Sequence, residues 1–133
     1  RCNMQKLEKE ARKYMQDKLI IEECITPDLY ERLAGNTAIF PKEKALEYLA
    51  LGLTSEAGEV AGKVKKLIRD GEDKEGFELK KIAISHEIGD VLWYCAMLAK
   101  EVGVPLNEIM RDNLAKLYSR KERGTLSGSG DDR

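Results

Sequence analysis

Residues 56–59 read Glu-Ala-Gly-Glu and residues 87–90 read Glu-Ile-Gly-Asp, and these two segments decide the fold. Each segment places two acids at i and i+3, so both carboxylates of a pair point to nearly the same side of a helix. Leu53 and Val60 flank Glu56 at helical spacing, so this acid occupies a position where the pattern predicts an apolar residue. Four converging carboxylates repel one another unless protons or cations intervene. The two segments therefore predict adjoining helices whose acids share a divalent metal ion.

The candidate metal ligands are all carboxylates: Glu56, Glu59, Glu87 and Asp90. An all-carboxylate site selects hard cations, Mg2+ or Mn2+, over zinc or copper. A di-iron bundle would need Glu-x-x-His pairs, and His86 is the single histidine and lies outside such a pair. His86 is expected to be an ordinary helix-face residue, because neighbouring positions on a helix point about 100° apart. A glycosidase pair would need an aromatic sugar cleft, which an aromatic content of 6% disfavours.

Hydrophobic periodicity predicts an all-α chain. The expected helices cover residues 4–24, 42–69, 79–102 and 105–122, with a short helical turn at 28–33. Gly71 suits the left-handed position after a helix, and the short polar connection that follows forces an antiparallel return. This return brings the two acidic pairs to comparable distances from the turn. Gly58 and Gly62 lie one turn apart and predict close approach of another backbone or of a ligand.

We expect a four-helix bundle-like protomer in which residues 4–123 form one domain and residues 124–133 form a Gly/Ser-rich tail. The 23 basic and 24 acidic residues nearly cancel, which gives no global indication of a nucleic acid polymer or a membrane as partner. Cys2, Cys24 and Cys95 are odd in number and widely spaced, which favours reduced thiols and a cytoplasmic location. No stretch approaches the roughly 20 apolar residues of a membrane span.

Aromatic residues occur near both acidic segments. Thr37, Ile39 and Phe40 lie in a long irregular connection and either present an aromatic face to a flat ligand or anchor the loop through hydrophobic contacts. Trp93 and Tyr94 follow the second acidic pair directly. Their positions favour a role in the core or at a subunit interface, with base stacking as the alternative.

Basic and amide side chains provide candidate phosphate ligands. Lys63 lies one turn beyond the first acidic pair, where its ammonium group could reach a phosphate. Asn113, Lys116 and Arg120 form a row at i, i+3 and i+7 of the last helix, which suits oxyanion binding. The alternative is that both groups belong to ordinary solvated faces.

Two longer segments resemble the MazG-like nucleoside triphosphate pyrophosphohydrolases, whose pattern is E-x-x-E on one helix and E-x-x-D on the next. These segments are LGLTSEAGEVAGKVKK at residues 51–66 and HEIGDVLWYCAMLAKEVGVPLNEIMRDNLAKL at residues 86–117. The resemblance covers about residues 36–133 and implies the all-α NTP pyrophosphatase fold. Residues 4–35 match no firm motif, so the preferred base and sugar are not predicted.

The resemblance also implies a reaction, in which a nucleoside triphosphate and water give a nucleoside monophosphate and pyrophosphate. It implies Mg2+ at the four acids, phosphate contacts from Asn113, Lys116 and Arg120, and assembly as a homodimer or homotetramer. Glu56 or Glu59 would orient the attacking water. Two other hypotheses stay open: a noncatalytic metal- or nucleotide-binding regulatory module, and a structural bundle in which the acids pair with Lys63 and Lys66.

Overall fold

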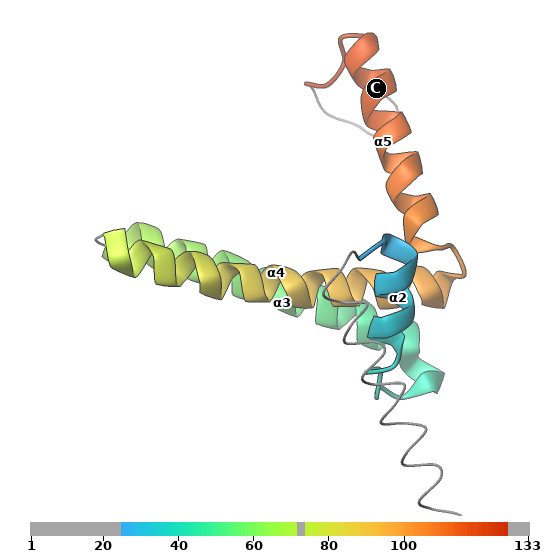
Figure 1. The fold of residues 1–133 in the computed structure, drawn as a ribbon, viewed down its shortest axis with the longest axis horizontal. Helices are drawn as coiled ribbons and strands as arrows, with labels where there is room; N and C mark the ends of the chain where they lie inside the picture. Colours follow the sequence, from blue (N-terminus) through green and yellow to red (C-terminus); the bar gives the residue numbers. More distant parts are fainter. Residues whose placement is uncertain (1–24, 72–73, 128–133) are drawn as a thin grey trace, which may run out of the picture.

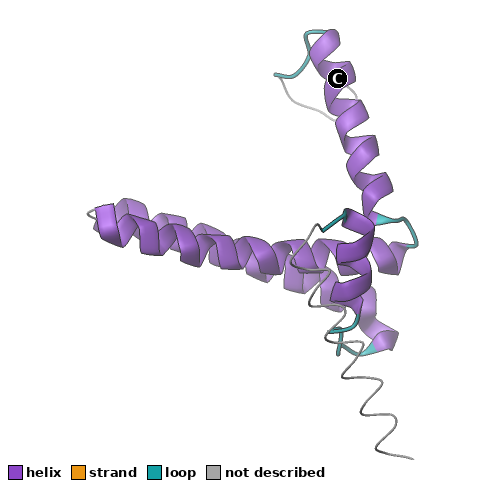
Figure 2. Ribbon diagram, viewed as in Figure 1, coloured by secondary structure: helices purple, strands orange, loops and turns teal. Residues whose placement is uncertain are grey.

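The computed structural model describes residues 25–71 and 74–127, and these residues are helical without any β-strand (Figure 2). The elements in chain order are α2 (Pro27–Gly35), the 3-10 helix η1 (Lys42–Lys44), α3 (Ala45–Asp70), α4 (Lys74–Val102) and α5 (Leu106–Glu122). The predicted all-α class is therefore confirmed for this part of the chain. The helix expected over residues 4–24 lies outside the described residues.

Two helix starts differ from the prediction for identifiable reasons. The short turn expected at residues 28–33 is the longer helix α2, because Thr26 caps it: its Oγ1 accepts a hydrogen bond from the Leu29 backbone N–H at 3.2 Å. Pro27 at the first helical position adds to this start. Helix α4 begins at Lys74 rather than at Leu79, since Gly76 is tolerated inside the helix.

Helices α3 and α4 form a long antiparallel hairpin, in which they lie side by side (Figure 1). Gly71 ends α3 with φ of +61°, and its N–H donates to the Leu67 carbonyl at 3.2 Å. This is the left-handed termination that the sequence predicts. The hairpin brings the acidic segment of α3 opposite the acidic segment of α4.

The buried core lies where α2 crosses the hairpin, near the end opposite the turn (Figure 1). Leu49 of α3 is completely buried there and packs with Ala34 of α2 and with Ala96 and Met97 of α4. Small residues on α2 and α4 let the helices approach closely around the leucine side chain. This end of the hairpin is consequently the most firmly packed part of the described chain.

A glycine in α3 sets the contact between the two long helices, but it is not one of the glycines that the sequence singled out. A Cβ atom at Gly52 would overlap the ring of Tyr94 on α4, whereas a Cβ at Gly58 or Gly62 would meet nothing within 4 Å. The close approach of another backbone that was predicted at Gly58 and Gly62 is thus absent from the described part of one copy. Gly52 is where α3 makes room for an aromatic side chain.

Helix α5 leaves the hairpin and projects away from it (Figure 1). It is fixed at its beginning, where the Leu106 N–H donates to Glu31 Oε2 at 2.8 Å and Asn107 Nδ2 donates to Asp28 Oδ2 at 2.9 Å. Within one copy, the described helices therefore form a hairpin from which α5 diverges, and the predicted four-helix bundle-like protomer includes a helix at residues 4–24 that lies outside the described residues. The apolar side of α5 stays exposed instead: Ile109, Met110, Leu114, Leu117 and Tyr118.

An apolar pocket of about 480 Å³ lies among α2, α4 and α5. Tyr30, Leu92, Cys95 and Ile109 are among its lining residues. Burial raises the pKa of the Cys95 thiol above its ordinary value. In the described part of the chain, none of the helices has the length and apolar character needed to cross a membrane.

Alanine substitutions at two glycines of α3 test the helix contact. We expect Gly52→Ala to lower the free energy of unfolding by about 1–2 kcal/mol, because overpacking against Tyr94 outweighs the gain in helix propensity. Gly62→Ala, the matched control in open space, should raise it by up to about 1 kcal/mol. Urea denaturation measures both values, and an equal gain for the two variants would contradict the contact.

Candidate functional site

Three of the four predicted acids meet in the groove between α3 and α4. Glu56 of α3 and Glu87 and Asp90 of α4 each offer one carboxylate oxygen, and these oxygens lie within 4.8 Å of one another. Glu56 and Glu87 are half-buried and Asp90 is exposed. We refer to these three residues as the acidic cluster.

Glu59 is exposed and is not part of the acidic cluster. Three residues of α-helix turn the chain by about 300°, so Glu59 is rotated by about 60° from the direction of Glu56. On α3 this rotation leaves one acid of the pair outside the cluster, whereas both acids of the α4 pair belong to it. The predicted cluster of four carboxylates is thus a cluster of three within one copy.

Lys63 contributes a positive charge beside the acidic cluster. Its Nζ lies 3.0 Å from Glu87 Oε1, with 31% of the lysine side chain and 18% of the glutamate side chain exposed. The sequence placed this lysine near a phosphate, and its contact in the structure is the ion pairing expected of a structural bundle. One ammonium and three carboxylates leave a formal charge of −2 (+1 − 3), which matches one divalent cation. The oxygen ligands are of the hard type that Mg2+ and Mn2+ prefer, so the residues present fit such an ion.

A pocket of about 370 Å³ adjoins the acidic cluster on the side toward α2. Glu56 and Asp90 line it together with Thr37, Trp93 and Tyr94. Trp93 Nε1 donates a hydrogen bond to Thr37 Oγ1 at 2.8 Å, and the Thr37 hydroxyl donates to the Ala34 carbonyl at 2.7 Å. The indole ring is therefore held in one orientation beside two carboxylates. We refer to this space as the aromatic pocket.

Phe40 packs against Trp93, which lines the aromatic pocket. Its ring meets the Trp93 ring edge-on at a centroid distance of 6.4 Å and stacks on Tyr48 at 5.7 Å. Ile39, by contrast, is 97% exposed. Of the two interpretations of this loop, the geometry favours the hydrophobic anchor for Phe40.

Tyr94 connects the aromatic pocket to the acidic cluster. Burial raises the pKa of Tyr94, and the neighbouring Tyr48, Glu56 and Asp90 raise the same pKa further. The phenol is therefore protonated at neutral pH and is a hydrogen-bond donor next to the carboxylates. The sequence did not predict the interaction of Tyr48 with Tyr94, because nothing in the local pattern indicates that Tyr48 of α3 faces α4.

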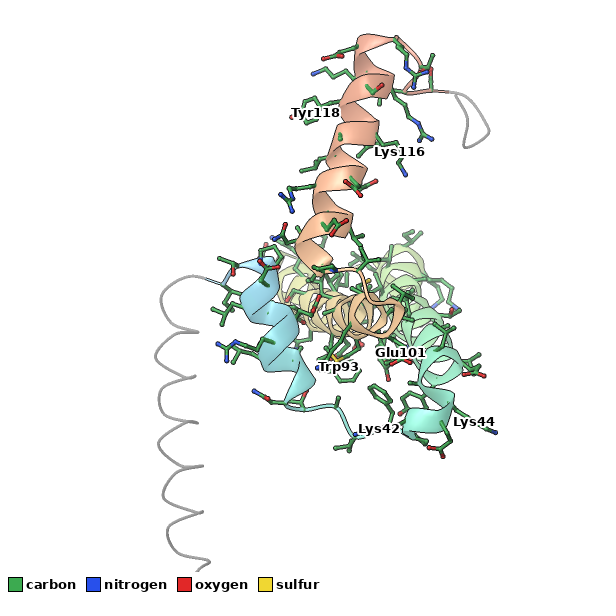
Figure 3. The ribbon with its side chains drawn as sticks, turned by 90° about the vertical axis from the view of Figure 1, so that its right-hand side faces the viewer. Lys42, Lys44, Trp93, Glu101, Lys116 and Tyr118 are labelled. Carbon is green, nitrogen blue, oxygen red and sulfur yellow. The ribbon has the colours of Figure 1, made fainter. Side chains whose placement is uncertain are left out.

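The remaining predicted phosphate ligands lie on α5, away from the acidic cluster. Figure 3 shows Lys116 on the helix that rises from the hairpin, whereas Trp93 lies at the hairpin itself. Asn113 and Lys116 are exposed, and Arg120 is buried near the end of α5. One copy of the chain therefore does not bring these three residues to the acids.

The chain is similar to a known domain family and to a phage protein. The family model of the MazG nucleotide pyrophosphohydrolase domain matches residues 44–125, a range that contains the acidic cluster. The chain is also 43% identical over 114 residues to the Gene 37 protein of Mycobacterium phage L5, a similarity that covers 80% of this chain and 97% of the phage protein. No solved structure matches the chain.

Glutamine variants of the two α3 acids test the composition of the site. We expect Glu56→Gln to weaken Mn2+ binding at least about tenfold, because it removes a ligand from the acidic cluster. Glu59→Gln, the matched control outside the cluster, should change the affinity about threefold or less. Isothermal titration calorimetry without nucleotide measures both affinities, and equal losses would show that Glu59 is a ligand.

The metal-free Glu56→Gln protein should unfold at the same temperature as the wild type or higher, since repulsion among the acids is relieved.

Proposed function

The chain belongs to the MazG nucleotide pyrophosphohydrolase family, and we propose that it hydrolyses nucleoside or deoxynucleoside triphosphates to the monophosphate and pyrophosphate, with Mg2+ or Mn2+. The observation that carries the proposal is the acidic cluster, formed by carboxylates of two adjoining helices within 4.8 Å of one another. It opens directly into the aromatic pocket, which has the dimensions of a small-ligand site. Housecleaning of the nucleotide pool is the biological role that this activity would serve.

The residues of the acidic cluster would have different roles in this reaction. Glu87 and Asp90 would hold the divalent cation together with Glu56, and a cation bound there neutralises phosphate charge and lowers the pKa of water. Glu56 also lines the aromatic pocket, so we assign it the additional role of orienting the attacking water toward the α-phosphorus. A bond forms between the water oxygen and the α-phosphorus while the bond to the bridging α–β oxygen breaks. Pyrophosphate leaves with that oxygen.

The aromatic pocket is the natural place for the nucleoside. Trp93 offers an immobilised aromatic ring, and Tyr94 offers a protonated phenol close to Glu56 and Asp90. A base or sugar held against these side chains would place its α-phosphate at the acidic cluster. Thr37 lines the same pocket and is a further candidate for contact with the nucleoside.

We further propose that the active form is a homodimer or homotetramer in which α5 of one copy approaches the hairpin of another. The apolar residues along α5 are exposed in one copy, and contact with a second copy would cover them. Such contact would also bring Asn113 and Lys116 to the phosphates that bind at the partner's acids. Within a single copy both residues belong to α5, which projects away from the hairpin (Figure 1).

An activity assay tests the proposed function. The protein is incubated with Mg2+ and a panel of NTPs and dNTPs, and the products are separated by ion-exchange chromatography. We expect a nucleoside monophosphate and pyrophosphate in equal amounts from at least one substrate, and a loss of at least about 100-fold in kcat for Glu56→Gln. Release of inorganic phosphate would refute the proposal. Binding of nucleotide without turnover would instead favour a noncatalytic regulatory module.

Mixing two inactive variants tests whether the site spans two copies. If Lys116 reaches the acids of a partner, Glu56→Gln and Lys116→Ala subunits that are unfolded and refolded together should recover up to about a quarter of the wild-type activity per site. Each variant refolded alone is the control and should stay inactive. An assembly that remains inactive after mixing would show that each site is complete within one copy.

A further inference from the structure

A second small pocket lies in the same groove, beyond the acidic cluster and toward the turn of the hairpin. Its volume is about 190 Å³, and it is lined by Lys63 and Lys66 of α3 and by Lys80 and Ala83 of α4. Three of its four lining residues are lysines, and they come from both helices. We refer to this space as the lysine pocket.

We propose that the lysine pocket holds the β- and γ-phosphates of the substrate and, after cleavage, the pyrophosphate product. The proposal rests on the function proposed above and adds residues that the resemblance does not assign. Lys63 joins the two sites, since it lines the lysine pocket and also lies 3.0 Å from Glu87 of the acidic cluster. Anionic oxygens in this pocket would therefore be next to the acids that hold the cation.

The order of sites along the hairpin supports this assignment. The aromatic pocket lies on one side of the acidic cluster and the lysine pocket on the other, since Glu56 lines the first and Glu87 contacts a lysine of the second. Lys63 follows Glu56 by seven residues, which is roughly 10 Å along a helix axis. This span suits a triphosphate chain. A nucleotide laid along the groove would place its base near Trp93, its α-phosphate at the acids and its terminal phosphates at the lysines.

The basic lining of the lysine pocket also favours an anion. The hydrogen bond from Arg69 is the main cause that lowers the pKa of Asp70, and Lys80 and Lys66 lower it further. Arg69 Nη2 donates to Asp70 Oδ2 at 2.8 Å, so Asp70 is engaged by its own neighbour. Lys63 is paired with Glu87, and Lys66 and Lys80 line the lysine pocket beside this pair. An anion of the size of pyrophosphate would be drawn to this end of the groove.

Product inhibition tests the proposal without requiring knowledge of the preferred base. The inhibition constant of pyrophosphate is measured with Mg2+ for the wild type, Lys66→Ala, Lys80→Ala and the control Lys65→Ala. We expect the constant to rise about tenfold in the two pocket variants, as for the loss of a charge-assisted hydrogen bond, and less than about twofold in the control. Inhibition by the nucleoside monophosphate should be unchanged in all four proteins, and Lys66→Arg should retain the wild-type value.

Two outcomes would overturn the lysine pocket as the pyrophosphate site: unchanged inhibition in both pocket variants, or an equal effect of Lys65→Ala. If the wild type hydrolyses no triphosphate, the proposed function fails by itself. The lysine pocket is then tested by calorimetric titration of the same variants with magnesium pyrophosphate. The same tenfold loss supports the pocket as an anion site, and its absence overturns it.

Discussion

The packing of Tyr94 against Gly52 is the constraint on which the site depends, because it fixes how α3 and α4 lie along each other. A side chain at position 52 would displace the aromatic ring, so the two helices approach closely only in this register. The buried Leu49 one turn earlier secures the same end of the hairpin. From that contact toward the turn, the register sets Glu56 opposite Asp90 and then Lys63 opposite Glu87. The positions of the aromatic pocket, the acidic cluster and the lysine pocket therefore all depend on how α3 packs against α4.

The groove shows how a fold accommodates like charges. Glu87 has an ammonium group at 3.0 Å, and Asp90 is exposed to water, so neither acid is buried without compensation. This ion pair is mostly buried, with 31% of the Lys63 side chain and 18% of the Glu87 side chain exposed. Lys63 also lines the lysine pocket, so its ammonium group would be within reach of an anion bound there. The ion pair expected of a purely structural bundle and the phosphate contact expected of an enzyme are thus compatible roles of one side chain.

The sequence was sufficient for the features that depend on local spacing and insufficient for those that depend on packing direction. The helical class, the termination at Gly71 and the antiparallel return followed from periodicity and glycine chemistry, and the return does bring Glu56 to Glu87 and Asp90. The rotation of Glu59 out of the groove did not follow, because an i, i+3 pair is only approximately on one face. The direction of α5 is set by contacts of Leu106 and Asn107 with α2, which no periodicity reveals. The sequence did not predict the lysine pocket, because its residues come from two helices.

Trp93 is the single tryptophan of the chain, and its indole is held by Thr37 on the wall of the aromatic pocket. The intrinsic fluorescence of the protein excited at the red edge of its absorption therefore originates beside the acidic cluster. Any occupant of the pocket would alter the polarity around that one emitter. The fluorescence of Trp93 can therefore report binding in the groove without a chemical label and without signal from a second tryptophan.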